Sequence, residues 1–191
     1  MEDLGGPMIE IRIHGRGGQG AVVASAVLAS ALFYDGRYVQ AFPAFGVERR
    51  GAPVMAFTRW DFKPIRTRTN IYQPDHVIVL DQTLLFEGVG VTAGLKEHGW
   101  ILVNSPKDLQ SAEFSKFKVA VVAAGDIAVR HKLGSPTAPV VNTAILGAFS
   151  KITGMVTIGS VVRAIREHAP DKKEENVAAA REAYSKVHRA T

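Results

Sequence analysis

The segment 11–25, IRIHGRGGQGAVVAS, constrains the fold most, because it joins a short apolar strand to a helix through a glycine-rich loop. The helix carries no charged residue before Asp35. A helix that is apolar all round is buried in protein or membrane. The apolar stretch 21–34 is shorter than the ~20 residues that cross a bilayer. We therefore expect a soluble chain whose first helix packs between a sheet and another layer.

Short apolar runs at 76–81, 99–104 and 117–124 predict the centre of a sheet. Runs without polar alternation are typical of parallel strands buried on both faces, and we expect the segment 83–98 between the first two to be helical. Further strands are expected at 8–14, 36–45 and 54–60, and helices at 19–35, 142–153, 157–169 and 171–191. This order predicts the α/β class: a Rossmann-like layered fold, with a mainly parallel sheet flanked by helices and a helical C-terminal third.

Length and composition predict one domain over residues 8–191, preceded by a loosely ordered stretch over 1–7. The start, MEDLGGPM, lacks the basic and apolar parts of a signal peptide, so we expect a cytoplasmic protein. The net charge of +5 comes without a run of five Lys or Arg, which argues against nucleic-acid binding. The absence of cysteine excludes disulfides, a thiol nucleophile and an iron–sulfur cluster held by this chain.

The glycine-rich loop matches the pattern G-x-G-x-x-G between a strand and a helix. Its candidate binding residues are Gly15, Arg16, Gly17, Gly18, Gln19 and Gly20. Glycines bring backbone N–H groups close to an anion, and the helix N-terminus adds partial positive charge. The alternative is that the glycines only allow the strand and helix to pack closely. Dinucleotide binding also needs an acid at the end of the second strand, but that strand ends in Gln40-Ala41-Phe42-Pro43, so an NAD-dependent dehydrogenase is the second choice.

A second candidate anion site is the loop that holds Arg49 and Arg50, which should lie near the C-terminal edge of the sheet. Arginine donates bidentate hydrogen bonds to phosphates. The two arginines could equally be exposed charges, or pair with Glu48 or with a carboxylate of a partner.

The remaining polar residues suggest neither a metal site nor a catalytic set. The histidines are scattered without metal-ligand spacing, and His14, beside the glycine loop, is expected to be structural. Asp81 and Asp126 follow buried strands, where an acid can face a ligand or cap the next helix. We assign no catalytic residue and no metal ligand to this chain.

Three segments together resemble the gamma subunit of 2-oxoacid:ferredoxin oxidoreductases: IRIHGRGGQGAVVAS, AFPAFGVERRGAPVMAFTR and NTAILGAFSKITG. The resemblance runs from Met8 to the final helix. The segment FPAFGVERRGAPV is most similar to the pyruvate branch of the family (pyruvate synthase), with the 2-oxoisovalerate branch a close second.

The resemblance implies a subunit of a complex that oxidatively decarboxylates a 2-oxoacid, forms an acyl-CoA and reduces ferredoxin. Thiamine diphosphate and [4Fe–4S] clusters would lie in partner alpha, beta and delta subunits, while this chain would help to bind coenzyme A and pack on the thiamine-binding subunits. The family motifs fall on the glycine loop (15–20), on Glu48, Arg49, Arg50 and Gly51, and on Asn142. Two other readings stay open: a stand-alone nucleotide-binding oxidoreductase and a purely structural adaptor.

Overall fold

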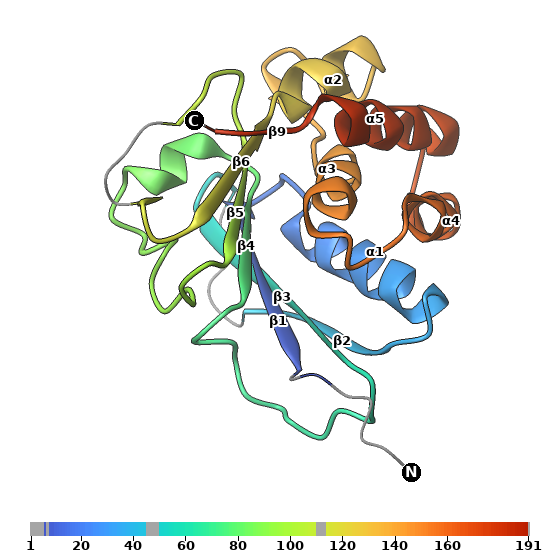
Figure 1. Cartoon of the computed structure of the whole chain (residues 1–191). Coiled ribbons are helices and arrows are strands. Elements are labelled where there is room, and N and C mark those ends of the chain that lie inside the picture. The colour runs from blue at the N-terminus through green and yellow to red at the C-terminus, as the bar shows by residue number, and fades with distance from the viewer. Residues whose placement is uncertain (1–5, 7, 45–49, 110–113, 191) are drawn as a thin grey trace.

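One seven-stranded sheet forms the centre of the fold in a computed structural model that describes residues 6, 8–44, 50–109 and 114–190. The sheet order is β2-β3-β1-β4-β5-β6-β9 (Figure 1). The strands are β1 (Ile9–Arg16), β2 (Tyr38–Pro43), β3 (Pro53–Asp61), β4 (His76–Val79), β5 (Trp100–Asn104), β6 (Lys118–Val122) and β9 (His188–Arg189). The short strands β7 (Gly134–Ser135) and β8 (Ala138–Pro139) form a separate hairpin.

The sheet is mainly parallel, as the sequence predicts. β1, β4, β5 and β6 are neighbours and pair in parallel. β3 is antiparallel to β1, and β2 is antiparallel to β3, so β2 runs in the direction of β1. Only β3 and β9 among the seven strands run the other way.

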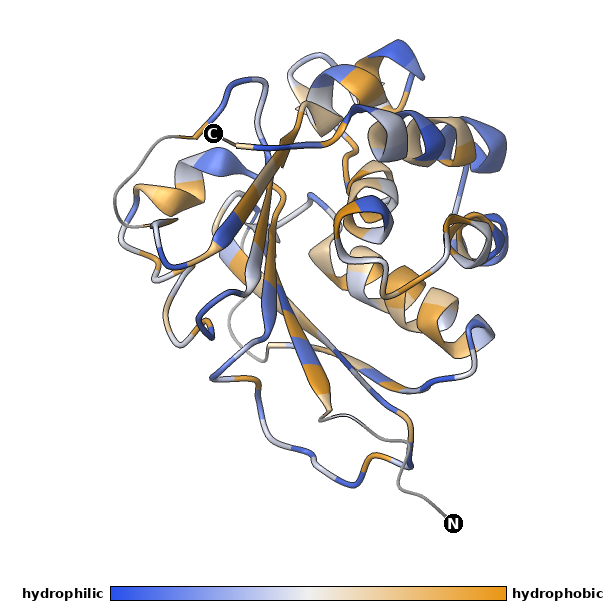
Figure 2. Ribbon diagram, viewed as in Figure 1, coloured by the Kyte–Doolittle hydropathy of each residue, from blue (hydrophilic) through white to orange (hydrophobic). Residues whose placement is uncertain are grey.

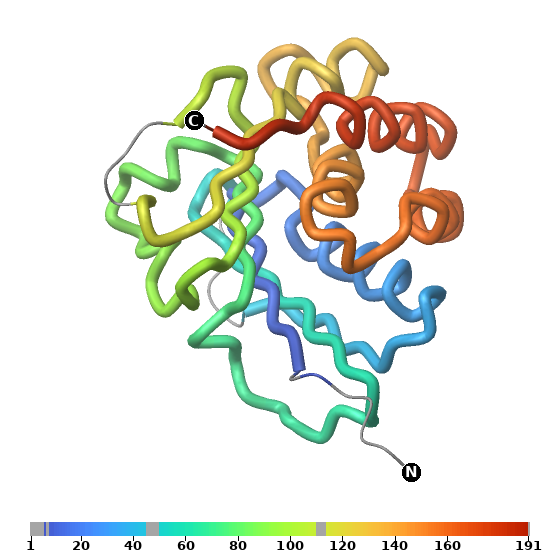
Figure 3. The backbone as a smooth tube through the Cα atoms, viewed as in Figure 1, coloured from blue at the N-terminus to red at the C-terminus, as the bar shows by residue number. Residues whose placement is uncertain are grey.

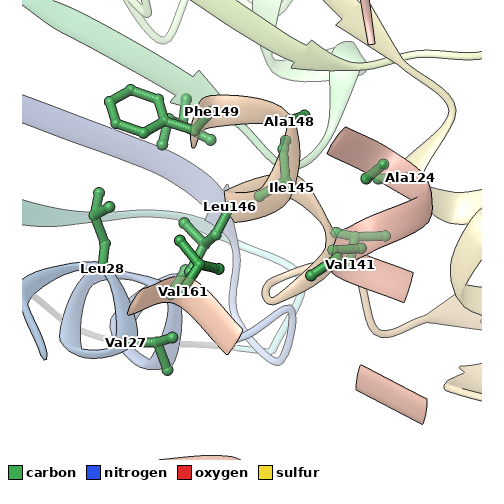
Figure 4. Close-up of a cluster of buried hydrophobic side chains, with 14 of the residues drawn as sticks. Val27, Leu28, Ala124, Val141, Ile145, Leu146, Ala148, Phe149 and Val161 are labelled. Carbon is green, nitrogen blue, oxygen red and sulfur yellow. The ribbon is translucent and has the colours of Figure 1, made fainter. Parts of the chain in front are cut away.

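The five α-helices lie on one side of the sheet. They are α1 (Ala21–Tyr34), α2 (Ala124–Arg130), α3 (Ala144–Thr153), α4 (Ile158–His168) and α5 (Lys173–Lys186). Of these helices, α1 and α3 contact the strands, and α4 and α5 pack on these two helices. Figure 1 shows α1, α3, α4 and α5 on the same side of the strands. Their apolar side chains and those of the strands form one core, part of which is drawn in Figure 4, where Val27 and Leu28 of α1 lie near Val161 of α4.

The opposite face is covered by a short 3-10 helix, η1 (Gln82–Leu85), and by turns, which enclose a second, smaller core. The prediction of a helix over 83–98 is wrong beyond η1. Gly88, Gly90 and Gly94 all have a positive φ (69°, 66° and 70°), which a right-handed helix does not contain. These glycines turn the chain across the sheet instead of letting a helix continue.

The hydropathy pattern explains why α1 is buried while α4 and α5 are partly exposed. In Figure 2 the central strands β4, β5 and β6 and the helix α1 are largely hydrophobic, whereas α4 and α5 carry hydrophilic residues. None of the helices in the described ranges is long and apolar enough to cross a membrane. Of the first seven residues the structure describes only Gly6, so the expected boundary at residue 8 stays a prediction.

Candidate functional site

The glycine loop lies at the point where the strand order of the sheet reverses. The chain leaves β1 through α1 and builds β2 and β3 on one side of β1, then continues to β4 on the other side. In open α/β sheets, ligands bind outside the carboxyl ends of the strands at such a point. The topology therefore places the loop 15–20 where a ligand site is expected.

Backbone hydrogen bonds join the glycine loop to the arginine-containing segment. Gly17 N donates to Ala52 O (2.9 Å), and Gly51 N donates to Gly17 O (3.1 Å). Arg50 forms a β-bridge with Gly17 and is exposed. The prediction that Arg50 lies near the C-terminal edge of the sheet is confirmed; Glu48 and Arg49 lie outside the described residues.

The side chain of Arg16 is held by acidic and polar groups of the chain itself. Its Nε donates to Asp81 Oδ2 (3.0 Å), and its second guanidinium nitrogen donates to Thr83 Oγ1 and Glu87 Oε1 (both 2.6 Å). These two carboxylates compensate its charge. Arg16 therefore ties β1 to the segment after β4, and its guanidinium could contact an anion only by giving up some of these bonds.

Gln19 and Asp81 complete this network beneath the loop. Gln19 Oε1 accepts from Arg16 N (2.8 Å), and Gln19 Nε2 donates to Asp81 Oδ2 (3.1 Å). Burial alone would raise the pKa of Asp81, but hydrogen bonds from Thr83, Gln19 and Arg16 outweigh it and hold that pKa below its usual value. Asp81 also caps η1 by accepting from Thr83 N (3.0 Å), so the capping role left open by the sequence is confirmed.

The N-terminus of α1 has no side-chain cap, and Gly20 stands at the N-cap with a φ of 79°. A Cβ at Gly20 would overlap the amide group of Asn142, which is 7% exposed. Glycine is required here both for the left-handed backbone and for the close approach of Asn142. The asparagine that the family resemblance singles out thus lies directly against the glycine loop.

A pocket of about 210 Å³ lies beside this contact. Asn142, Thr143 and Asn176 line it and are buried, while Val23 of α1 and Lys172 form other parts of its wall. Thr143 Oγ1 donates to Asn176 Oδ1 (2.5 Å), and Lys172 Nζ donates to Lys132 O (2.7 Å). The lining also includes Asp171 and apolar residues such as Leu133 and Val140, so the pocket mixes polar and apolar walls and does not by itself select an anionic ligand.

His14 is a buried structural residue, as expected. Arg12 Nε donates to His14 Nε2 (2.8 Å), and a terminal nitrogen of Arg12 donates to Val91 O (2.9 Å) and Ala93 O (2.7 Å). Burial, and then the charge of Arg12, lower the pKa of His14 from 6.5 to about 3. Neutral His14 therefore helps Arg12 to fix the turns that cover the second face of the sheet.

This geometry predicts a loss of stability in mild acid. The unfolded chain binds a proton at His14 near pH 6.5, whereas the folded chain resists it until about 3, so the free energy of unfolding falls as pH drops through this window. Glutamine at position 14 keeps a hydrogen-bond acceptor but does not titrate. In His14→Gln we therefore expect the free energy of unfolding to change less steeply with pH, by up to ~1.4 kcal/mol per pH unit. Urea denaturation of both proteins at several pH values measures the difference. Equal slopes would contradict the assignment; His76, whose pKa burial lowers to about 4, is the same in both.

Sequence reasoning missed two residues at this edge and left one uncertain. Glu87 follows η1 and no local pattern marks it as a partner of Arg16. Asn104 ends β5, donates to Leu80 O (3.0 Å) and accepts from Gly125 N (3.0 Å), which joins three strand ends; its place at the end of a buried run was the available signal. Asp126 lies exposed in the first turn of α2, where its charge favours the helix N-terminus.

The strand order explains why the dinucleotide acid is missing. In dinucleotide-binding folds the second strand runs parallel beside the first, and its terminal acid reaches the ribose. Here the antiparallel strand β3 separates β2 from β1, so the end of β2 is one strand too far away. In the described part of the chain, no group of three His, Asp or Glu residues could hold a metal ion.

A comparison with protein families identifies the family of this chain. The profile of the family described as "Pyruvate ferredoxin/flavodoxin oxidoreductase" matches residues 10–186. The chain belongs to this family. The family is that of the resemblance recognised in the glycine loop, the arginine loop and the Asn142 segment, so that recognition is confirmed.

Curated members of the pyruvate ferredoxin/flavodoxin oxidoreductase family are similar over almost their whole length. The "Pyruvate/ketoisovalerate oxidoreductases common subunit gamma" of Pyrococcus furiosus is 54% identical, over 94% of this chain and 97% of the relative. "Pyruvate synthase subunit PorC" of Methanothermobacter thermautotrophicus is 51% identical, over 94% of this chain and 96% of the relative. The crystal structure of pyruvate oxidoreductase subunit PORC from Thermotoga maritima has a TM-score of 0.78 at 36% identity, and the match covers 97% of this chain and 100% of that one.

Proposed function

We propose that this chain is the gamma subunit of a pyruvate:ferredoxin oxidoreductase, which converts pyruvate and coenzyme A to acetyl-CoA and reduces ferredoxin. The observation that carries the proposal is the end-to-end likeness to relatives named as gamma or PorC subunits at more than half identity. 2-Oxoisovalerate is the second candidate substrate, because the name of the Pyrococcus relative covers both pyruvate and ketoisovalerate.

The chain would act only within the complex. Thiamine diphosphate and [4Fe–4S] clusters supply the decarboxylation and electron-transfer chemistry, and we assign them to the alpha, beta and delta subunits. This fits a chain that has no cysteine to ligate a cluster. This chain would help to bind coenzyme A and would pack on the thiamine-binding subunits. The assembled complex, located in the cytoplasm, would bind ferredoxin.

Coenzyme A would meet this chain through its phosphates. Arg50 is exposed and lies beside Gly17, and α1 begins next to it without a side-chain cap. An exposed guanidinium and a helix N-terminus both favour phosphate groups. Arg16 and Gln19 would contribute indirectly, because their side chains hold the loop onto Asp81. We include Arg49 because it precedes Arg50 in the same sequence motif.

The kinetics of arginine variants test this assignment. In the assembled complex, we expect Arg49→Ala and Arg50→Ala each to raise the KM for coenzyme A about tenfold or more with little change in kcat, because a charge-assisted hydrogen bond contributes about 1.5–3 kcal/mol. Arg181→Ala, on the exposed side of α5, serves as the control. An unchanged KM in an intact complex would show that the arginine loop does not bind coenzyme A and would favour the structural-adaptor reading.

A further inference from the structure

The strand β2 forms one edge of the sheet, and within the described ranges its only ladder partner is β3. The outer side of an edge strand presents N–H and C=O groups that can pair with another chain. A pocket of about 310 Å³ opens at this edge, and the described residues that line it are Gln40, Ala41, Phe42 and Arg68. We call these four residues the β2 socket.

Phe42 is the aromatic residue of the β2 socket, and neighbouring side chains support its ring. The rings of Phe42 and Phe57 lie 5.2 Å apart, and the guanidinium of Arg59 lies 5.4 Å from the ring centre of Phe42. Tyr38 precedes Gln40 and Phe42 on the same face of β2 and is 50% exposed. Aromatic residues and arginine are the types that dominate protein–protein binding energies. The socket can therefore take an apolar side chain at the edge of an exposed strand.

The connection between β3 and β4 is a long irregular loop, visible at the bottom of Figure 3, and hydrogen bonds from Gln40 of β2 and Arg59 of β3 hold it against these two strands. Arg59, which is fully buried, donates to Thr67 O (3.2 Å) and Thr69 O (2.9 Å). Gln40 Nε2 donates to Ile65 O (3.2 Å). The loop is thus fixed against β2, and Arg68 is held in place at the rim of the socket.

This loop carries three exposed cations, Lys63, Arg66 and Arg68, for which no ion pair occurs within the described residues. No acidic residue lies between Asp61 and Asp75 in the sequence. Both of these carboxylates have other partners: Asp61 accepts from Phe62 N and Lys63 N, and Asp75 accepts from Glu10 N and Lys96 Nζ. Among the described residues, the surface beside β2 is therefore positively charged, and these three cations have no acidic partner there.

We propose that the β2 socket and these three cations dock an extended acidic segment of another subunit of the complex. The segment would add to β2 as a further strand, place an apolar side chain in the socket and bring its carboxylates to Lys63, Arg66 and Arg68. Main-chain pairing supplies affinity in this mode and side-chain pockets supply specificity, while complementary charge steers the encounter. The inference rests on the proposed function, because it requires a multi-subunit complex.

The test uses the complete complex, co-expressed with an affinity tag on a thiamine-binding subunit. One variant combines Lys63→Glu, Arg66→Glu and Arg68→Glu, and a second, Ala41→Trp, fills the socket without changing the charge. The matched control combines Lys173→Glu, Arg181→Glu and Lys186→Glu, which changes the net charge equally on exposed positions of α5. The measurement is the amount of this chain captured at about 0.15 M salt, divided by its soluble amount before capture.

We expect both socket variants to lower the captured fraction at least fivefold relative to the wild type and the control. Capture of either socket variant at the wild-type level overturns the proposal. If the triple charge variant is captured at the wild-type level but no longer binds heparin, the three cations form a nucleic-acid surface instead. Ferredoxin reduction with pyruvate, measured on the same wild-type sample, tests the proposed function separately. An assembled but inactive wild-type complex would contradict that function and leave the comparison of captured fractions valid.

Discussion

Replacing Arg59 with methionine is expected to lower the free energy of unfolding by roughly 3–5 kcal/mol. Arg59 is fully buried, and its guanidinium bonds Glu10 Oε1 (2.8 Å) as well as the loop carbonyls of Thr67 and Thr69. Methionine fills much of the volume but donates nothing, so the Glu10 carboxylate and both carbonyls lose their donor. Chemical denaturation of the purified chain measures the change.

Arg66→Met provides the matched control for Arg59→Met, because Arg66 lies in the same region but is exposed. A surface substitution of this kind is expected to stay within about 0.5 kcal/mol. Adding Glu10→Gln to Arg59→Met should recover part of the loss, since it removes the unpaired charge. A loss below about 1 kcal/mol for Arg59→Met would mean that the buried ion pair does not fix the loop.

Replacing Gly147 with alanine is expected to destabilise the fold by roughly 3 kcal/mol. Gly147 lies where α3 crosses α5, and a Cβ there would overlap the carbonyl oxygen of Ala180. The obstacle is backbone, which cannot rotate away as a side chain can, so the two helices would have to separate. The separation would also loosen the core that Figure 4 shows around Ile145, Leu146 and Ala148.

The same substitution at Gly159 in α4 gives the control, because a Cβ there would lie 3.9 Å from Thr157 Oγ1, an ordinary contact. Alanine favours the helix more than glycine does, so Gly159→Ala should be neutral or stabilising by up to ~1 kcal/mol. Thermal or urea unfolding distinguishes the two. Equal stabilities of Gly147→Ala and Gly159→Ala would contradict the close helix crossing.

Most of the sheet could be predicted from the sequence because its strands are short and buried. The apolar runs at 76–81, 99–104 and 117–124 became β4, β5 and β6 with boundaries shifted by at most two residues. Burial on both faces selects uninterrupted apolar residues, which are visible locally. The direction of β3 and its position between β1 and β2 were not visible, because pairing between strands depends on contacts distant in sequence.

The same distinction applies to the candidate site. The place of the glycine loop between strand and helix follows from local spacing, and the resemblance drew attention to Arg50 and Asn142, which lie beside the loop. The inward turn of Arg16 could not be predicted, since its acidic partners Asp81 and Glu87 lie 65 and 71 residues further along the chain. The helix predicted over 83–98 does not form for a local reason, because the repeated glycines in this segment adopt a left-handed backbone. The regular alternation of strands and helices elsewhere in the sequence favoured a helix there.

The most direct test of the central claim is ferredoxin reduction by the co-purified subunits with and without this chain, using pyruvate and 2-oxoisovalerate in the presence of coenzyme A. We predict reduction with pyruvate, or with both oxoacids, that requires this chain in the complex, and no turnover by the chain alone. NAD-dependent turnover by the isolated chain, or an equal rate of ferredoxin reduction when the complex lacks it, would contradict the account.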